Sequence, residues 1–111
     1  MKRMREMQHR LAVAGLLGVL LVAPSAAGEV VRVAINDLAF SPAEVTAKVG
    51  DIIEWENGDF VDHTATAKDG TWDVAIAAGK SAQLPLTTVG AFAYYCKVHP
   101  GMTGTIHVDA K

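Results

Sequence analysis

The sequence predicts an all-β domain, an antiparallel β-sandwich or barrel built from about six to eight short strands. Two observations indicate this fold class. Short runs alternate apolar and polar residues, which is the pattern of strands with one buried face. Turn-forming residues such as Asn57-Gly58-Asp59 separate the runs at intervals of roughly 8–12 residues, which leaves no room for a crossover helix.

The alternation also locates the individual strands. In the run 30–35 three branched apolar residues share one face and Arg32 takes the other, and in the run 52–57 Trp55 faces inward. The segment 72–78 fits no single class. The expected strands are 30–35, 44–48, 52–57, 64–67, 81–86, 91–96 and 103–108.

Residues 1–27 are not expected to belong to this domain. A basic start precedes an apolar run at 11–23, and small residues follow it at 24–27. This pattern is typical of a secretory signal peptide, so we expect cleavage after Ala27 and export to the periplasm. The apolar run is shorter than the roughly 20 residues that cross a membrane, so the mature chain 28–111 is expected to have no membrane span. An uncleaved anchor is the alternative.

The composition of 28–111 restricts the function. This segment has 84 residues and a formal net charge of −5, because it keeps six of the ten basic residues and eleven of the twelve acidic ones. An acidic domain argues against nucleic acid as a partner. Exported domains of this size often add disulfides or a metal ion to a limited core. The single cysteine, Cys96, cannot form an internal disulfide, so a metal is expected; the alternative is a free thiol or an intermolecular bridge.

The strongest chemical signal lies in the loop 96–102, where Cys96, His99 and Met102 follow one another at intervals of three residues. Singly, each has an ordinary explanation, since Cys and Met often fill cores and a lone His is often a loop residue. Together they predict a metal site. His63, which ends an upstream polar loop, can join them because loops gather at the ends of a sandwich. A thiolate, two imidazoles and a weak axial thioether form the ligand set of a blue-copper electron-transfer centre.

With these residues the chain resembles the cupredoxin family of blue copper proteins. The two-residue spacers on either side of His99 are most similar to those of the amicyanins within that family. The resemblance covers all of 28–111 and includes the opening strand, a turn at Phe40-Ser41-Pro42, the turn 49–51 with Trp55 after it, the His63 loop and the ending 90–108.

The resemblance implies both the fold and the roles of the site residues. It implies a Greek-key β-sandwich with the ligand loops at one end. It also implies one type 1 copper ion that changes between Cu(I) and Cu(II). His63, Cys96 and His99 would be the equatorial ligands, and Met102 would be the axial ligand.

Three positions depart from the family pattern. Cupredoxins usually have Asn after the first histidine ligand, which pins the ligand loops together; Thr64 offers a shorter clamp, although its backbone N–H can reach the Cys96 sulfur. Amicyanins have Pro and Phe where this chain has Val98 and Gly101. Val98 restores a backbone N–H that can point at the thiolate, and hydrogen bonds to the sulfur favour Cu(I). We therefore predict a higher reduction potential than in the Val98→Pro variant.

The resemblance also implies that the protein is an electron carrier and not an enzyme, with no catalytic residues. Electrons would pass by outer-sphere transfer through the exposed edge of His99, beside Phe60. The expected partners are redox proteins, such as a c-type cytochrome and a periplasmic dehydrogenase, and the domain is expected to be a monomer. A basic partner could be steered by four acidic residues that flank the His63 loop: Glu54, Glu56, Asp59 and Asp62.

The sequence also has to be compared with three other classes of function. Periplasmic copper storage or delivery would use the same ligands, although delivery sites favour Met-rich coordination and 28–111 contains only Met102. A structural zinc domain usually has paired cysteines, and this sequence lacks that spacing. A copper oxidase or nitrite reductase would need further histidine clusters.

Overall fold

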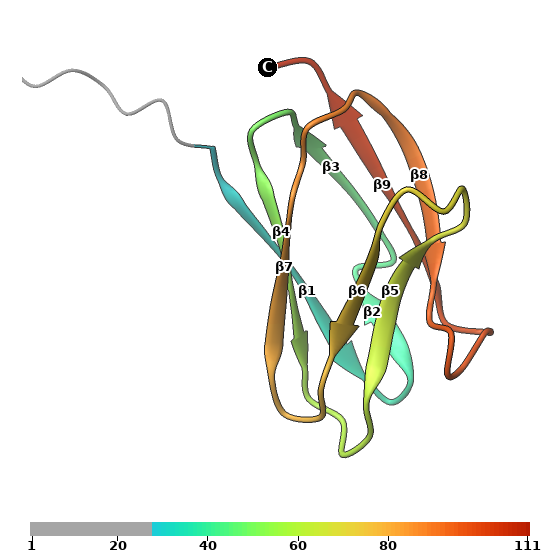
Figure 1. Cartoon of the computed structure of the whole chain (residues 1–111). Helices are drawn as coiled ribbons and strands as arrows, with labels where there is room; N and C mark the ends of the chain where they lie inside the picture. Colours follow the sequence, from blue (N-terminus) through green and yellow to red (C-terminus); the bar gives the residue numbers. More distant parts are fainter. Residues whose placement is uncertain (1–27) are drawn as a thin grey trace, which may run out of the picture.

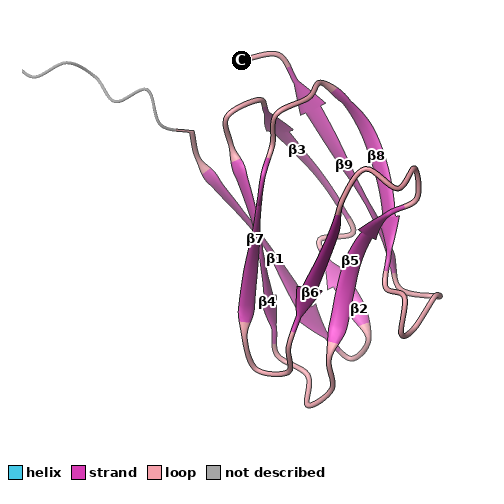
Figure 2. Ribbon diagram, viewed as in Figure 1, coloured by secondary structure: helices cyan, strands magenta, loops and turns pink. Residues whose placement is uncertain are grey.

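The computed structural model describes residues 28–111, and within this range it contains nine strands and no helix (Figures 1 and 2). The expected signal peptide, 1–27, lies outside the described residues. Within them, no helix has the length and apolar character needed to cross a membrane. The strands are β1 (Val30–Asn36), β2 (Ala39–Ser41), β3 (Glu44–Lys48), β4 (Ile52–Asn57), β5 (His63–Ala67), β6 (Asp73–Ile76), β7 (Ser81–Pro85), β8 (Gly90–Tyr95) and β9 (Thr103–Asp109).

The strands form two sheets that pack face to face, so the all-β sandwich is confirmed. One sheet has the order β2-β1-β4-β7 and the other the order β3-β9-β8-β5-β6. Two pairs, β1 with β4 and β3 with β9, are parallel, so the sheets are mixed and not purely antiparallel. Between β1 and β4 the chain passes through β3 in the other sheet, which lets it return in the same direction without a helix (Figure 1). Apolar alternation reports which face of a strand is buried and carries no information on strand direction.

Two segments differ from the sequence expectation. The expected turn at 40–42 overlaps β2, which pairs with β1 across a tight turn at Asp37 and Leu38. Both turn residues have positive φ, 51° and 59°, the backbone of a hairpin turn that usually carries Asn-Gly or Asp-Gly. Neither dipeptide is present here, so the hairpin had no sequence signal. The ambiguous segment 72–78 contains the short strand β6, which pairs with β5.

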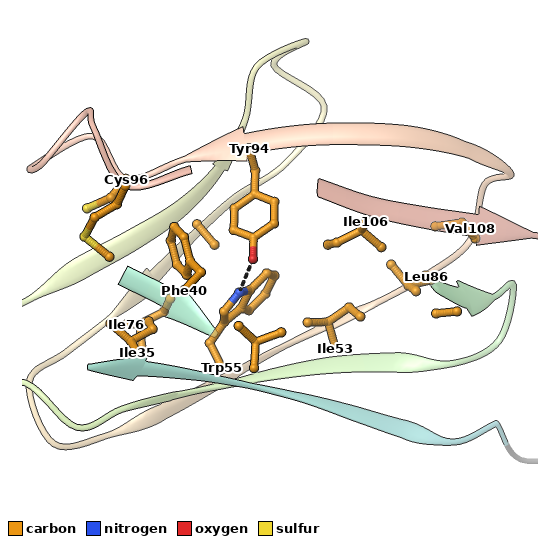
Figure 3. Close-up of a cluster of buried hydrophobic side chains, with 14 residues drawn as sticks. Ile35, Phe40, Ile53, Trp55, Ile76, Leu86, Tyr94, Cys96, Ile106 and Val108 are labelled. Carbon is orange, nitrogen blue, oxygen red and sulfur yellow. Dashed lines mark hydrogen bonds between the residues drawn. The ribbon is translucent and has the colours of Figure 1, made fainter. Parts of the chain in front are cut away.

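The core lies between the sheets and follows the predicted alternation (Figure 3). Trp55 of β4 is 0% exposed and donates its Nε1–H to the hydroxyl oxygen of Tyr94 in β8, 3.2 Å away. This bond joins the two sheets through the centre of the core. Trp72 is partly buried, and its ring centroid lies 6.0 Å from that of Trp55. Cys96 lies at one end of this cluster and Leu86 and Val108 at the other, so the metal-site loop is built onto a packed end of the sandwich (Figure 3).

Candidate metal centre

Strand pairing places the two ligand segments at the same end of the molecule. His63 is the first residue of β5, and Cys96 directly follows the last residue of β8. β5 and β8 are antiparallel neighbours, with Thr66 opposite Tyr95, so the start of one lies beside the end of the other. The β4–β5 and β8–β9 loops both lie away from the C-terminus (Figure 1).

The loop 96–102 is closed by its own backbone. The N–H of Cys96 donates to the carbonyl of Met102 at 3.1 Å, and the N–H of Met102 donates to the carbonyl of His99 at 2.8 Å. Pro100 and Gly101 form the exposed tip between them. These two bonds close the loop, and within it the His99 side chain is half-buried.

The structure brings together three of the four predicted ligands. One side-chain donor atom from each of His63, Cys96 and His99 lies within 4.8 Å of the others. The Cys96 Sγ is 3.7 Å from the His63 Nδ1, and the two imidazole rings meet edge to face with centroids 5.1 Å apart. His63 and Cys96 are buried, and His99 is half-buried. A single ion can be reached from all three donors.

Met102, the fourth predicted ligand, is buried in the core. Its side chain is 4% exposed and belongs to the same buried core cluster as Cys96. Its backbone makes both hydrogen bonds that close the loop. The axial thioether role of Met102 stays a prediction.

An unsatisfied donor atom indicates that the cluster is built to hold a metal. The Nδ1 of His99 is buried and has no hydrogen-bond partner among the described residues. Buried polar atoms in proteins almost always have a partner, so an exception needs an explanation. A copper ion shared with a thiolate and a second imidazole would supply the missing partner, and this donor set suits copper.

Asp59 determines which nitrogen of His63 carries a proton. Its Oδ2 lies 2.9 Å from the His63 Nε2, and its two oxygens also accept the backbone N–H groups of Asp37 and Leu38. The Leu38 N–H, followed by His63, holds the pKa of Asp59 below its usual value, so the carboxylate is an acceptor only. The proton of a neutral His63 must then lie on Nε2, which leaves the Nδ1 lone pair free beside Cys96.

This role of Asp59 was missed by sequence analysis, which assigned the residue to the steering of a partner. The spacing of four residues before His63 is a weak signal, because the β4–β5 loop alone decides whether the two side chains meet. That loop is held by Asn57, which is 4% exposed. Its amide donates to the carbonyls of Val61 at 2.9 Å and Ile76 at 3.1 Å, and its oxygen accepts the N–H of Asp59.

The environment of Cys96 favours the thiolate, which is the form that binds a metal. Burial raises the pKa of the thiol, but hydrogen bonds from the backbone N–H groups of Thr64, His99 and Val98 outweigh burial and lower the pKa. The Thr64 N–H lies 3.3 Å from the sulfur. The predicted contact of the Thr64 backbone with the sulfur is therefore observed.

The Thr64 side chain also joins the two ligand loops, although it is shorter than the Asn of the family. Its Oγ1 accepts the N–H of Lys97, the residue after Cys96, at 2.9 Å. The clamp that the family obtains from an amide is thus provided here by a hydroxyl.

The other acidic residues near the His63 loop are engaged within the chain. Glu54 and Glu56 lie 3.2 and 3.5 Å from the guanidinium of Arg32, and Asp62 accepts the N–H of Ala78. With Asp59 included, each of the four carboxylates proposed for steering has an ion-pair or hydrogen-bond partner in the chain. One arginine and several backbone N–H groups leave these four carboxylates with a net negative charge, so the steering of a basic partner stays a prediction.

A two-sheet β-sandwich whose one end gathers a thiolate and two imidazoles is the architecture of a blue-copper protein. The cupredoxin-like domain model matches residues 9–108, and the chain belongs to this family. At the level of the family it is a blue-copper electron carrier, and the cofactor that the family and the donor set indicate is one type 1 copper ion.

Individual relatives agree with this assignment. The chain is 29% identical over 102 residues to amicyanin from Paracoccus versutus, which covers 78% of this chain and 73% of that protein. The crystal structure of amicyanin from the same organism is 27% identical with a TM-score of 0.63, over 78% of this chain and 85% of that one. A purple cupredoxin from Nitrosopumilus maritimus has a TM-score of 0.65 at 21% identity, over 71% and 99% of the two chains, which shows the shared fold. The similarity to amicyanin that the loop spacing predicts is confirmed.

Proposed function

We propose that this protein is an exported, periplasmic electron carrier in which His63, Cys96 and His99, with Met102 as the axial ligand, hold one copper ion. The convergence of three donor atoms within 4.8 Å, one of them the unpartnered Nδ1 of His99, carries this proposal. Export rests on the signal-peptide pattern of 1–27, with 28–111 as the mature domain.

Each site residue has a distinct task in such a carrier. Copper supplies the one-electron change between Cu(I) and Cu(II). Cys96 supplies a thiolate, and the Thr64 N–H at 3.3 Å withdraws part of its electron density. His63, held by Asp59, presents a fixed Nδ1 lone pair. Because these groups are attached to a packed sandwich, the donor geometry resists change when the charge changes, which keeps the barrier to electron exchange low.

The half-buried ring of His99 is the proposed port for outer-sphere transfer. It is the most exposed of the three converging side chains, and exposed apolar residues neighbour the ligands in sequence. Phe60 is fully exposed, and Val61 and Val98 are 46% and 56% exposed. An apolar rim of this kind suits a small, transient interface, typically below about 1,200 Å².

The proposed partners are other redox proteins, such as a c-type cytochrome and a periplasmic dehydrogenase, met by a monomeric domain. Arg32 offsets only one of the two charges of Glu54 and Glu56, so the His63 loop keeps a net negative charge and we expect the transfer rate to a basic partner to fall as the ionic strength rises. A transfer rate that does not change with added salt would contradict the steering hypothesis.

A Cu(II) titration of 28–111, followed by visible absorption and electron spin resonance, tests the proposal. We expect saturation at one copper per chain, an intense blue absorption and a small hyperfine splitting, all of which the Cys96→Ser variant should lose. Reduced protein should also transfer electrons rapidly to an oxidised c-type cytochrome. A pale complex that survives Cys96→Ser would contradict the proposal and favour copper storage or delivery.

A further inference from the structure

A closed ring of hydrogen bonds ties the loop 96–102 to the outer face of β5 and β6. The N–H of Lys97 donates to Thr64 Oγ1 at 2.9 Å, and the Thr64 and Thr66 hydroxyls are 2.8 Å apart. The Thr66 hydroxyl donates to Asp73 Oδ1 at 2.8 Å, and Asp73 Oδ2 accepts Lys97 Nζ at 2.6 Å. The ring therefore starts at the backbone of Lys97 and ends at its side chain.

The donor and the acceptor of each hydrogen bond in this ring can be assigned. A carboxylate paired with a lysine accepts only, so the Thr66 hydroxyl must donate to Asp73. Thr66 must then accept from the Thr64 hydroxyl, which leaves the Thr64 oxygen with its lone pairs for the Lys97 N–H. The position of the carboxylate thus fixes the orientation of the hydroxyl that holds the loop.

The strand register explains how the ring forms. β5 lies between β6 and β8 in the sheet (Figure 1), and Thr66 is opposite both Asp73 of β6 and Tyr95 of β8. Thr64 and Thr66 are two residues apart and share a face of β5. Directly opposed residues on neighbouring strands bring their side chains within contact, so Asp73 meets the Thr66 hydroxyl.

We propose that Thr66 and Asp73 are positioning residues for the metal-binding loop. They hold the Thr64 hydroxyl on the Lys97 N–H, and so keep Cys96 in place beneath the Thr64 N–H. The proposal rests on the proposed copper site for its purpose, but the restraint itself acts in the metal-free protein. Sequence analysis had no signal for either residue, because their contacts depend on the pairing of three strands.

The two halves of the ring are not equivalent. Thr66 is 9% exposed, so water cannot readily replace a lost partner of its hydroxyl. The side chains of Lys97 and Asp73 are 49% and 53% exposed, and ion pairs open to solvent are weak. The hydroxyl chain should therefore matter more than the ion pair, and Thr66→Val should loosen the loop more than Lys97→Met.

Two measurements on metal-free protein test the proposal: hydrogen exchange of the Lys97 amide, and alkylation of the buried Cys96 by iodoacetamide at one fixed pH. In Thr66→Val we expect both rates to rise roughly 2- to 10-fold, the factor set by one lost hydrogen bond. Thr66→Ser, which keeps the hydroxyl, should restore rates close to those of the unchanged protein.

Thr71→Val is the matched control. It removes a hydroxyl that donates to a carboxylate, that of Asp69, in the exposed turn between the same two strands. Urea unfolding of each variant separates local opening of the loop from a loss of global stability. Equal exchange and alkylation in Thr66→Val and Thr71→Val would overturn the proposal. If the rates respond as expected while copper gives no blue complex, the restraint is real and the electron-carrier function fails.

Discussion

Replacement of Asp59 by alanine tests how His63, a proposed copper ligand, is oriented for the metal. The His63 side chain is 0% exposed, and Asp59 is the acceptor of its Nε2–H at 2.9 Å. Without the carboxylate, a neutral ring can keep its proton on Nε2 or transfer it to Nδ1. In the first case a buried donor loses its partner, which costs about 1–3 kcal/mol. In the second case the proton occupies the atom that faces Cys96 Sγ at 3.7 Å, which is the atom that copper must bind.

The first outcome lowers the stability of the folded domain, and the second weakens copper binding. Loss of the partner that orients a metal-binding histidine typically lowers metal affinity by about 10- to 100-fold. That range equals roughly 1.4–2.7 kcal/mol, which overlaps the cost of leaving the ring donor unsatisfied. We therefore expect Asp59→Ala to bind copper about 10- to 100-fold more weakly and to unfold at lower urea in the metal-free form.

Competition with a chromophoric copper chelator measures this affinity. Asp59→Asn should recover part of it, because an amide oxygen in the place of Oδ2 still accepts from His63 and Leu38, whereas an amide nitrogen in the place of Oδ1 cannot accept the N–H of Asp37. Asp62→Ala is the matched control, since its carboxylate is adjacent to His63 in sequence but accepts only the N–H of Ala78, at 2.9 Å. The reasoning is refuted if Asp59→Ala binds copper as tightly as the unchanged protein, or if Asp62→Ala loses as much affinity.

Three further predictions concern the sulfur, the core and acid stability. Val98→Pro removes a backbone N–H that helps to lower the pKa of Cys96, so the reduction potential should fall in a redox titration. Tyr94→Phe leaves the buried Nε1–H of Trp55 without an acceptor and should lower the free energy of unfolding by about 1–3 kcal/mol in urea. Asp51 accepts two backbone N–H groups that hold its pKa below 3.8, so its stabilisation is present above that value and is lost as the pH falls through the lowered pKa. Acid unfolding of Asp51→Asn should therefore be less steep than that of the unchanged domain.

Each of these predictions has a control in the chain. For the first, Val98→Ala shortens the same side chain but keeps the backbone N–H. Equal reduction potentials in the Val98→Ala and Val98→Pro variants would contradict the prediction. Tyr95→Phe removes the hydroxyl of the half-buried tyrosine next to Tyr94, and a loss of unfolding free energy as large as that of Tyr94→Phe would contradict the second prediction. For the third, Asp109→Asn changes an exposed carboxylate and should leave the acid transition unaltered.

The amino-acid sequence predicts the donor set of the proposed metal site and the class of fold. The spacing of Cys96, His99 and Met102 is local, so a single short loop can present all three whatever lies around it. The alternation of apolar residues is local as well, and it located β3 and β4 with the bounds that the structure shows. Both patterns can be recognised without the tertiary structure, because each depends on only a few consecutive residues.

Tertiary structure decided how those ligands are held. Asp59 reaches His63 only because Asn57 folds the β4–β5 loop back, and the parallel pairing of β1 with β4 leaves no trace in either strand. Thr66 and Asp73 control the loop after Cys96 only because β5 pairs with β6 on one edge and with β8 on the other. Some of these contacts join residues close in the chain and others join residues on different strands, but all are hydrogen bonds, which require distances and angles that no pattern of residue types specifies. The proposed ligands can therefore be predicted from the sequence, whereas the restraints on them depend on how the loops and sheets pack.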